Sequence, residues 1–134
     1  MTVTTDHPNV QTVRAMTEAI FSQDHDALAR IFTDDLTFHF RAPHPLAGDH
    51  DGLGGLLAVL GAIFEATNGQ IELDTKLCIG TDGWATEFEH ARLSRNGKTV
   101  ESQNSFVYRF EDDRIAEMWM YVGLMPDVAE AFFG

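Results

Sequence analysis

Two glutamates, Glu87 and Glu89, stand two positions apart in segment 84–95, whose alternating residue types are typical of a β-strand. Side chains two positions apart on a strand face the same side of the sheet, so the two carboxyls share one environment. In an apolar cavity, loss of water would raise the pKa of such a carboxyl and make it a candidate general acid or base. On a wet face, both glutamates would be ordinary solvated charges.

The alternation of this segment by itself predicts that the two glutamates face solvent. It places Trp84, Thr86, Phe88 and His90 on the apolar, inward side, opposite the two glutamates. A β-bulge within the strand could switch the two faces midway. The position of the carboxyls is therefore open at this point.

Histidines and one cysteine are the other candidates for chemistry. His44, Asp49 and His50 occur in loop 41–52, rich in proline and glycine, but their irregular spacing matches no known ligand geometry, so we expect no metal site. Cys78 is the only cysteine; it is expected to be a packing residue and it fits a reducing cytoplasm. The chain has no glycine-rich phosphate loop after a strand, so no cofactor is expected.

Length and charge exclude several classes of protein. The 134 residues predict a single domain over 1–134, and 44% hydrophobic residues exclude disorder. A net charge of −12, from 21 acidic and 9 basic side chains, argues against nucleic-acid binding and against an anionic membrane surface. Apolar runs are shorter than the roughly 20 residues of a membrane span, and the N-terminus does not resemble a signal peptide, so we expect a cytoplasmic protein.

The elements that would position these residues follow from periodicity and turn signals. Residues 1–6 read as a polar tail, and Asp6 as the cap of a first helix. The predicted helices are 6–22, 25–32 and 53–67, and the predicted strands are 36–40, 71–79, 84–95, 98–110 and 114–122, with a short terminal segment 127–133. Segregated helices over a mainly antiparallel sheet predict the α+β class.

The last strand is apolar on both faces, so we expect it to be central and covered twice. Trp119 and Tyr121 point one way, whereas Met118, Met120 and Val122 point the other. A curved sheet around the helices would leave a concave cavity on one side, and its other face could stack on a second copy of the chain.

Several stretches resemble the NTF2-like superfamily, and within it the SnoaL-like polyketide cyclases and ketosteroid isomerases. They are SQDHDAL at 22–28, FTDDLTFH at 32–39, HPLAG at 44–48 and FEDDRIAEMW at 110–119. The resemblance implies a cone-shaped fold in which three N-terminal helices pack on a curved, mainly antiparallel sheet. This superfold hosts many chemistries and also plain binding proteins.

The resemblance also implies that the known catalytic groups are missing. The oxyanion tyrosine of the isomerases falls on Met16, their general base on Phe40 and their oxyanion aspartate on Phe106. The acid that cyclases carry after the tryptophan of the last strand falls near Val122 or Gly123.

What the resemblance implies for this chain is an apolar cavity. The residues it places inward are Met16, Phe38, Phe40, Asn104, Phe106, Tyr108, Met118, Met120 and Val122. It also turns Glu87 and Glu89 inward, against the alternation rule, which makes Glu89 the candidate catalytic residue. Strand parity puts His39 on the outer face with Trp119 and Tyr121, where we expect a homodimer interface.

Two functional hypotheses remain. The chain binds a hydrophobic small molecule and catalyses a cofactor-independent proton transfer of the isomerase or cyclase type, or it is a non-catalytic ligand-binding or dimerisation module. The direction in which Glu89 faces separates them best.

Overall fold

Four helices flank one curved sheet in the computed structural model, which describes residues 2–134. The helices are α1 (Pro8–Ser22), α2 (His25–Ile31), α3 (Gly52–Thr67) and α4 (Pro126–Phe133). The strands are β1 (Val3–Thr4), β2 (Phe32–Arg41), β3 (Gly48–Asp51), β4 (Ile71–Thr81), β5 (Trp84–Arg95), β6 (Lys98–Glu111) and β7 (Arg114–Gly123). The predicted α+β class is confirmed.

The sheet is mixed, with the strand order β1-β4-β5-β6-β7-β2-β3. Strands β4 to β7 form an antiparallel meander, whereas β1 pairs with β4 and β2 pairs with β7 in parallel. Because β2 returns beside β7, the last long strand is flanked on both edges and is interior to the sheet, as its two apolar faces predict.

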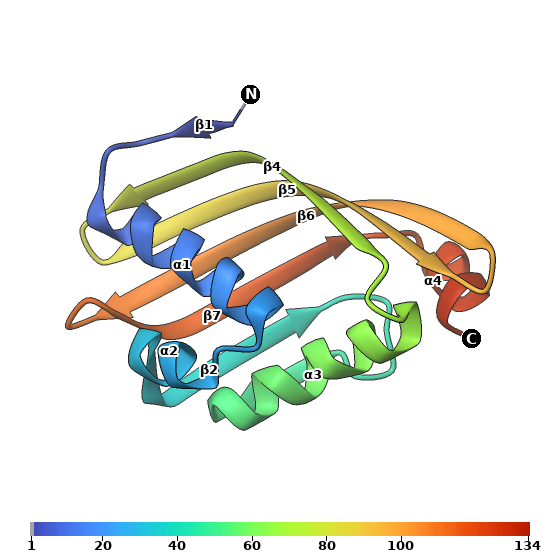
Figure 1. Ribbon diagram of the computed structural model, residues 1–134, viewed down its shortest axis with the longest axis horizontal. Coiled ribbons are helices and arrows are strands. Elements are labelled where there is room, and N and C mark those ends of the chain that lie inside the picture. The colour runs from blue at the N-terminus through green and yellow to red at the C-terminus, as the bar shows by residue number, and fades with distance from the viewer. Residues whose placement is uncertain (1) are drawn as a thin grey trace.

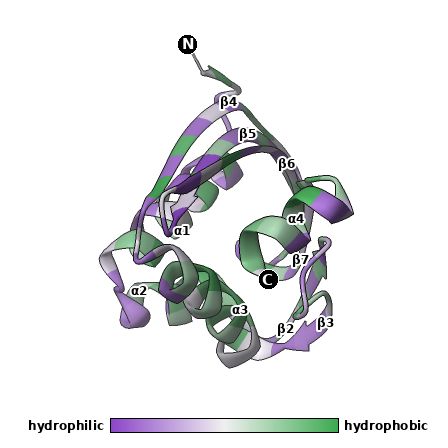
Figure 2. Cartoon of the chain, turned by 90° about the vertical axis from the view of Figure 1, so that its right-hand side faces the viewer, coloured by the Kyte–Doolittle hydropathy of each residue, from purple (hydrophilic) through white to green (hydrophobic). Residues whose placement is uncertain are grey.

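The helices lie on the concave side of this sheet (Figure 1). Helix α1 crosses β4 and β5, and α3 runs beside β2. Figure 2 views the molecule from the right-hand side of Figure 1 and shows the strands curling around the helices, with α4 at this end of the arch beside β6 and β7. The main core fills the space between them and includes Val13, Leu28, Phe38, Leu56 and Ile115, each fully or almost fully buried.

Local signals in the sequence explain how most elements end. Asn68 adopts a left-handed conformation (φ 52°) as the C-cap of α3, ahead of Gly69. Asn96 and Gly97 both have positive φ, 51° and 77°, which is the backbone that a two-residue hairpin between β5 and β6 requires. Long hairpin strands of this kind give the sheet enough length to curl over α1.

Other local predictions were wrong. His7, not Asp6, caps α1, because the His7 Nδ1 atom accepts a hydrogen bond from the Asn9 N–H at 3.1 Å. The predicted polar tail contains the short strand β1, and loop 41–52 contains β3. Helix α2 ends at Ile31 because Phe32 is already extended as the first residue of β2. These short pieces gain their hydrogen bonds from partners distant in the chain, which no local pattern reveals.

The terminal segment, for which the sequence predicts no helix or strand, forms helix α4. The Arg95 guanidinium donates to the Phe132 carbonyl at 2.9 Å, and the Lys98 ammonium donates to the Ala131 carbonyl at 3.2 Å. Both bonds satisfy carbonyls in the last turn, which have no partner within the helix. Phe132 is buried against Ala91 and Leu93 of β5.

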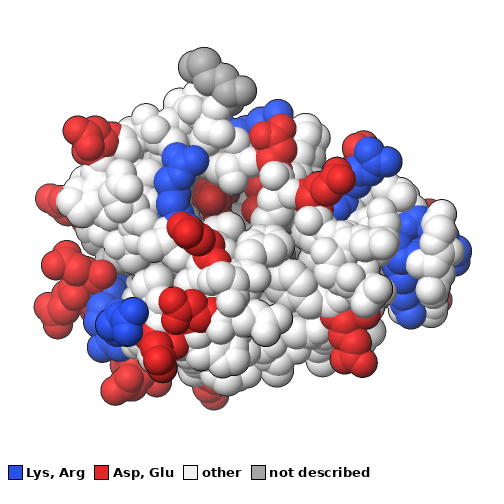
Figure 3. All heavy atoms as spheres, in the orientation of Figure 1, with Lys and Arg blue, Asp and Glu red and all other residues white. Residues whose placement is uncertain are grey.

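Charged side chains of both signs are interspersed on the face shown in Figure 3, and they form no continuous basic surface there. No helix in residues 2–134 is both long and apolar enough to cross a membrane.

Candidate active site

Glu87 and Glu89 both face the inside of the arch. Each is only 5% exposed, whereas Trp84, on the opposite face of β5, is 47% exposed. The two glutamates therefore face inward, and the prediction from alternation was wrong for this strand. Strand β5 pairs with β6 without a register shift from end to end, so no bulge in β5 causes this.

A bulge does occur in the neighbouring strand β4. Its pairing with β5 shifts between Thr75 and Leu77. Ile71 and Leu73 lie on the cavity side before the bulge, but beyond it Cys78 is buried in the core and Leu77 turns to the outer face. The regular alternation predicted for residues 71–79 breaks at this point, because the extra residue reverses the two faces.

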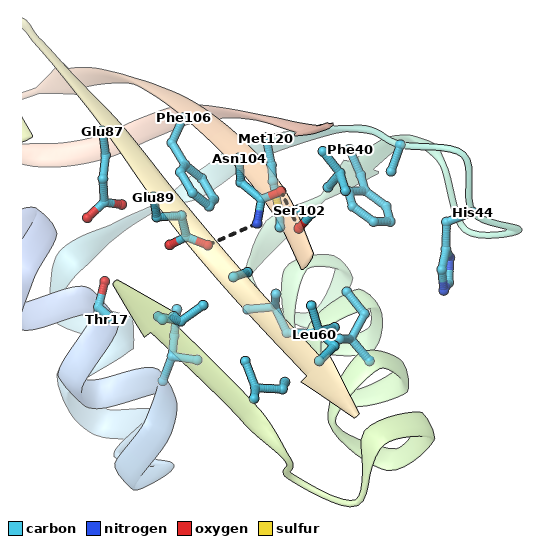
Figure 4. A pocket seen from close by; sticks show the side chains of 18 of the residues that line it. Thr17, Phe40, His44, Leu60, Glu87, Glu89, Ser102, Asn104, Phe106 and Met120 are labelled. Atoms are coloured by element: carbon cyan, nitrogen blue, oxygen red, sulfur yellow. Dashed lines mark hydrogen bonds between the residues drawn. The ribbon is translucent and has the colours of Figure 1, made fainter. Parts of the chain in front are cut away.

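A cavity of about 120 Å³ lies between the concave sheet face and helices α1 and α3. This is well above the roughly 10–15 Å³ that a single water needs. Its wall is largely aliphatic, aromatic and thioether in character. Polar side chains gather mainly on β5 and β6, where Figure 4 shows Glu87, Glu89, Asn104 and Ser102 close together.

A chain of hydrogen bonds holds Glu89. The Asn104 Nδ2–H donates to Glu89 Oε2 at 3.0 Å, and the Ser102 hydroxyl donates to Asn104 Oδ1 at 3.1 Å (Figure 4). The register explains the contact, because Glu89 and Asn104 are directly paired residues on β5 and β6. Since Ser102 occupies the amide oxygen, Asn104 presents its N–H to the carboxylate.

Glu87 has a different partner. The Tyr108 hydroxyl, fully buried on β6, donates to Glu87 Oε1 at 3.0 Å. Loss of water, and secondarily the negative charge of Glu89, raise the pKa of Glu87 to about 7 despite this bond. Burial also raises the pKa of Glu89, which the hydrogen bond from Asn104 opposes. Glu87 can therefore exchange a proton near neutral pH, while Asn104 supports the ionised form of Glu89.

Nearly all residues predicted to face inward do line this cavity. Those found at its wall are Met16, Phe40, Glu89, Asn104, Phe106, Tyr108, Met118, Met120 and Val122. Phe38 is the exception: it is completely buried, stacks on Phe40 at a centroid distance of 5.9 Å, and lies in the core away from the wall. The prediction for Phe38 was wrong because strand parity gives the face of a residue but not the depth of the cavity along the strand.

Of the polar groups around Glu89, sequence reasoning named Glu87 and Tyr108 but did not single out Ser102. The Ser102 hydroxyl bonds Asn104 two positions along β6, whereas the bonds from Asn104 to Glu89 and from Tyr108 to Glu87 cross from β6 to β5. Only the register of β5 against β6 reveals those cross-strand contacts.

The three candidate residues of loop 41–52, His44, Asp49 and His50, separate in the structure. Only His44 lines the cavity, where its ring contacts Phe40 and Phe133 at centroid distances of 5.6 and 4.9 Å. Burial lowers the pKa of His44, which favours the neutral ring. His50 bonds the Leu46 carbonyl instead. In residues 2–134, no group of three His, Cys, Asp or Glu side chains is arranged to hold a metal ion.

Asp49 belongs to an outer-face cluster around His39. The two ring nitrogens of His39 contact Asp49 Oδ1 at 2.7 Å and Glu117 Oε2 at 2.6 Å. Burial opposes the charged ring, but the bonds to the two carboxylates outweigh it, so the pKa of His39 is raised. The ring of His39 also stacks on Trp119, at 5.1 Å between centroids, and Trp119 stacks on Trp84 at 6.2 Å.

Comparison with known proteins identifies the family. A model of the SnoaL-like domain matches residues 13–118, most of the chain. The chain belongs to the SnoaL-like domain family. Among curated proteins, none is significantly similar to it.

Solved structures agree on the fold. Bal32a, from a soil-derived mobile gene cassette, is 21% identical, with a TM-score of 0.82 over 95% of this chain and 97% of its own. A cystatin-like protein of unknown function from Xanthomonas campestris is 23% identical, with a TM-score of 0.78 over 94% and 98%. IdmH from Streptomyces antibioticus, described as a proposed polyketide cyclase, is 19% identical, with a TM-score of 0.73 over 95% and 96%. At these identities the likeness concerns the fold alone.

This SnoaL-like protein departs from the cone predicted for it in two details. It has a fourth helix, α4, which packs at one end of the sheet against β5 and β6, and its sheet is mixed through the parallel pairs of β1 and β2.

Proposed function

We propose that this protein binds a small molecule with a largely apolar body in the cavity under the sheet, and that Glu89 transfers a proton to or from it without a cofactor. The observation that carries the proposal is a carboxyl on an apolar cavity wall. Glu89 is 5% exposed, its Oε2 atom is held by Asn104, and Oε1 takes no hydrogen bond within residues 2–134. A desolvated carboxylate with one open oxygen is suited to proton transfer.

The apolar wall suits a flat or irregular ligand body. Met118 and Met120 can adapt their shape to it, and Phe106 stacks parallel to Tyr108 at 6.1 Å with an interplanar angle of 6°. The positions where isomerase relatives place catalytic groups carry Met16, Phe40 and Phe106, which line the same wall. Any chemistry in this cavity therefore depends on the carboxyls of β5.

In the proposed step, a proton bound to a ligand carbon moves to the open oxygen of Glu89, and the electron pair of the C–H bond stays on the ligand. Return of that proton to another ligand atom completes an isomerisation. Glu87, whose pKa of about 7 allows both protonation states near neutrality, is the second group in the cavity able to give or take a proton.

Glu89→Gln tests this role, because glutamine keeps the shape but cannot accept the proton. The test compounds are apolar cyclic ketones, some with an amino group and some without. NMR follows hydrogen–deuterium exchange at their α-carbons in the presence and in the absence of the protein. We expect the variant to lose about 100-fold or more of any acceleration. Glu101→Gln, on the exposed part of β6, is the matched control and should keep full activity. Equal exchange rates for wild type and Glu89→Gln would eliminate Glu89 as the base.

We also propose that the outer face of the sheet forms a homodimer. Trp84 and Tyr121 are 47% and 46% exposed on that face. The Trp84 ring stacks on Trp119, which in turn stacks on His39. Large exposed aromatic rings clustered on one face are characteristic of protein interfaces.

A double variant, Trp84→Asp with Tyr121→Asp, should weaken this dimer by at least about tenfold in dissociation constant, because it buries two unpaired charges. Light scattering coupled to size exclusion measures the mass. Val128→Asp, on an exposed position of α4, is the control and should remain dimeric. A monomeric wild type at micromolar concentration would refute the dimer.

A further inference from the structure

The cavity contains acidic groups without a cationic side chain to balance them. Among the residues that line it are Glu87 and Glu89, but no lysine or arginine. The only basic group at the wall is His44, at the mouth, and burial favours its neutral form. Buried carboxylates are normally paired with a positive charge or a metal, because desolvated charge is costly. The two glutamates lack that partner within the described wall.

The donors that the protein does provide are neutral and incomplete. Tyr108 donates to Glu87 Oε1 and Asn104 donates to Glu89 Oε2, which leaves Glu87 Oε2 and Glu89 Oε1 without a bond in residues 2–134. Neither oxygen is sealed off, since the only fully buried and unpartnered side-chain polar atom in that range is Thr33 Oγ1. Both free oxygens therefore retain accessible surface for a donor from outside.

The cationic side chain that acts on Glu87 does not line the cavity. Arg14, exposed on α1, lowers the pKa of Glu87 through its field, but this effect is weaker than burial and than the repulsion from Glu89. Arg14 neither lines the cavity nor bonds either carboxyl. Its charge is thus screened by solvent and does not neutralise the pair.

We propose that the natural ligand is a cationic amphiphile, with a protonated amine between Glu87 and Glu89 and an apolar ring or chain against the rest of the wall. This inference rests on the proposed function, that the cavity binds a small molecule, and it names the ligand class. An ammonium group offers N–H donors to the two free oxygens at once, in charge-assisted bonds. A ligand carboxylate would be repelled by the same two groups.

The surroundings fit such a ligand. Phe106 and Tyr108 present aromatic rings beside the glutamates, and aromatic faces attract cations. Leu60, Ile63 and Val122 provide an apolar surface for the remainder. A positive nitrogen also acidifies neighbouring C–H bonds, so this ligand class is compatible with proton removal by Glu89.

The test compares three probes with a common body: 2-(2-naphthyl)ethylamine, 2-(2-naphthyl)ethanol and 2-naphthylacetate. Isothermal titration calorimetry at pH 7.5 should give about tenfold or more tighter binding for the amine than for the alcohol, and much weaker binding for the carboxylate. The amine stabilises ionised glutamates, so its binding should release protons from the protein. Titrations in buffers of different ionisation enthalpy measure that release.

Glu87→Gln combined with Glu89→Gln should bind the amine and the alcohol equally, whereas Glu101→Gln should keep the preference for the amine. Circular dichroism establishes whether each variant is folded. If the double variant does not fold, the single Glu87→Gln variant replaces it and should show a reduced preference for the amine over the alcohol. Equal binding of amine and alcohol by wild type would overturn the cationic ligand while leaving a small-molecule cavity intact. Binding of none of the three probes would overturn the proposed function as well.

Discussion

Glu87→Gln should stabilise the folded protein at pH 8 by about 1–3 kcal/mol, although it replaces a hydrogen-bonded carboxyl in the interior. Burial first, and the charge of Glu89 second, raise the pKa of Glu87 from 4.5 to about 7 on folding. Since each tenfold change in proton affinity corresponds to about 1.4 kcal/mol, the ionised side chain costs the folded state up to about 3 kcal/mol. Glutamine carries no charge and can still accept the bond from Tyr108.

The direction of the pH effect follows from proton binding. Between pH 4.5 and about 7, the folded state holds the Glu87 proton more tightly than the unfolded state does. The contribution of Glu87 to stability is therefore highest below pH 4.5, falls as pH rises, and reaches its lowest value above about 7. We expect Glu87→Gln to be close to wild type at pH 4 and more stable at pH 8.

Urea denaturation of wild type and variant from pH 4 to 8 measures this difference, and Glu101→Gln, exposed on β6, should show none of it. The difference between the two proteins isolates Glu87 from other groups such as Asp49, whose pKa is lowered by its bonds to His39 and Arg41. If the difference in unfolding free energy between wild type and Glu87→Gln stayed constant with pH, Glu87 would not be buried as described. A stabilising change at this site would also show that the carboxyl is kept for a purpose other than folding.

Phe38→Ala should cost about 3–5 kcal/mol of unfolding free energy, the largest loss that we expect from a single substitution in this protein. The Phe38 ring is completely buried in the core beneath β2 and has no contact with the cavity. Its removal leaves an enclosed void, and the neighbouring Phe40 and the strands around it can relax only in part. Ligand affinity should change little.

Phe106→Ala is the matched comparison. Phe106 is nearly as buried, at 6% exposure, but part of its surface already faces the cavity, so fewer packing contacts are lost. We expect a loss of about 2 kcal/mol, together with a clear change in the affinity for 2-(2-naphthyl)ethanol. Urea denaturation and calorimetry distinguish the two variants. Equal stability losses, or an altered affinity in Phe38→Ala alone, would contradict the position of the cavity wall.

The sequence alone was sufficient for the framework of this protein. The spacing of Val10, Val13 and Met16 predicts the buried face of α1, and Asn96-Gly97 predicts the β5–β6 hairpin, because both signals arise within a few residues. The double apolar character of residues 114–122 likewise predicts a strand in the interior of the sheet. The family motifs predicted the SnoaL-like fold.

Local signals could not determine which side of β5 is inside. Its apolar residues stand on both parities, and Trp84 and Phe88 outweigh Ala85 and Ala91 by size, so alternation pointed the wrong way. What reverses the outcome is distant in the chain: Tyr108 and Asn104 on β6 supply donors that make burial of Glu87 and Glu89 tolerable. Helix α4 depends on distant contacts in the same way, through Arg95 and Lys98.

The sequence by itself determined the class of fold, the helices and long strands, and an interior rich in methionine and phenylalanine. Only the tertiary structure decided that two carboxyls stand on that apolar wall, that Phe38 lies outside it, and that no lysine or arginine lines it. The physical reason is that periodicity is a property of neighbours in the chain. The protonation and pairing of a buried acid depend on the strands that fold around it.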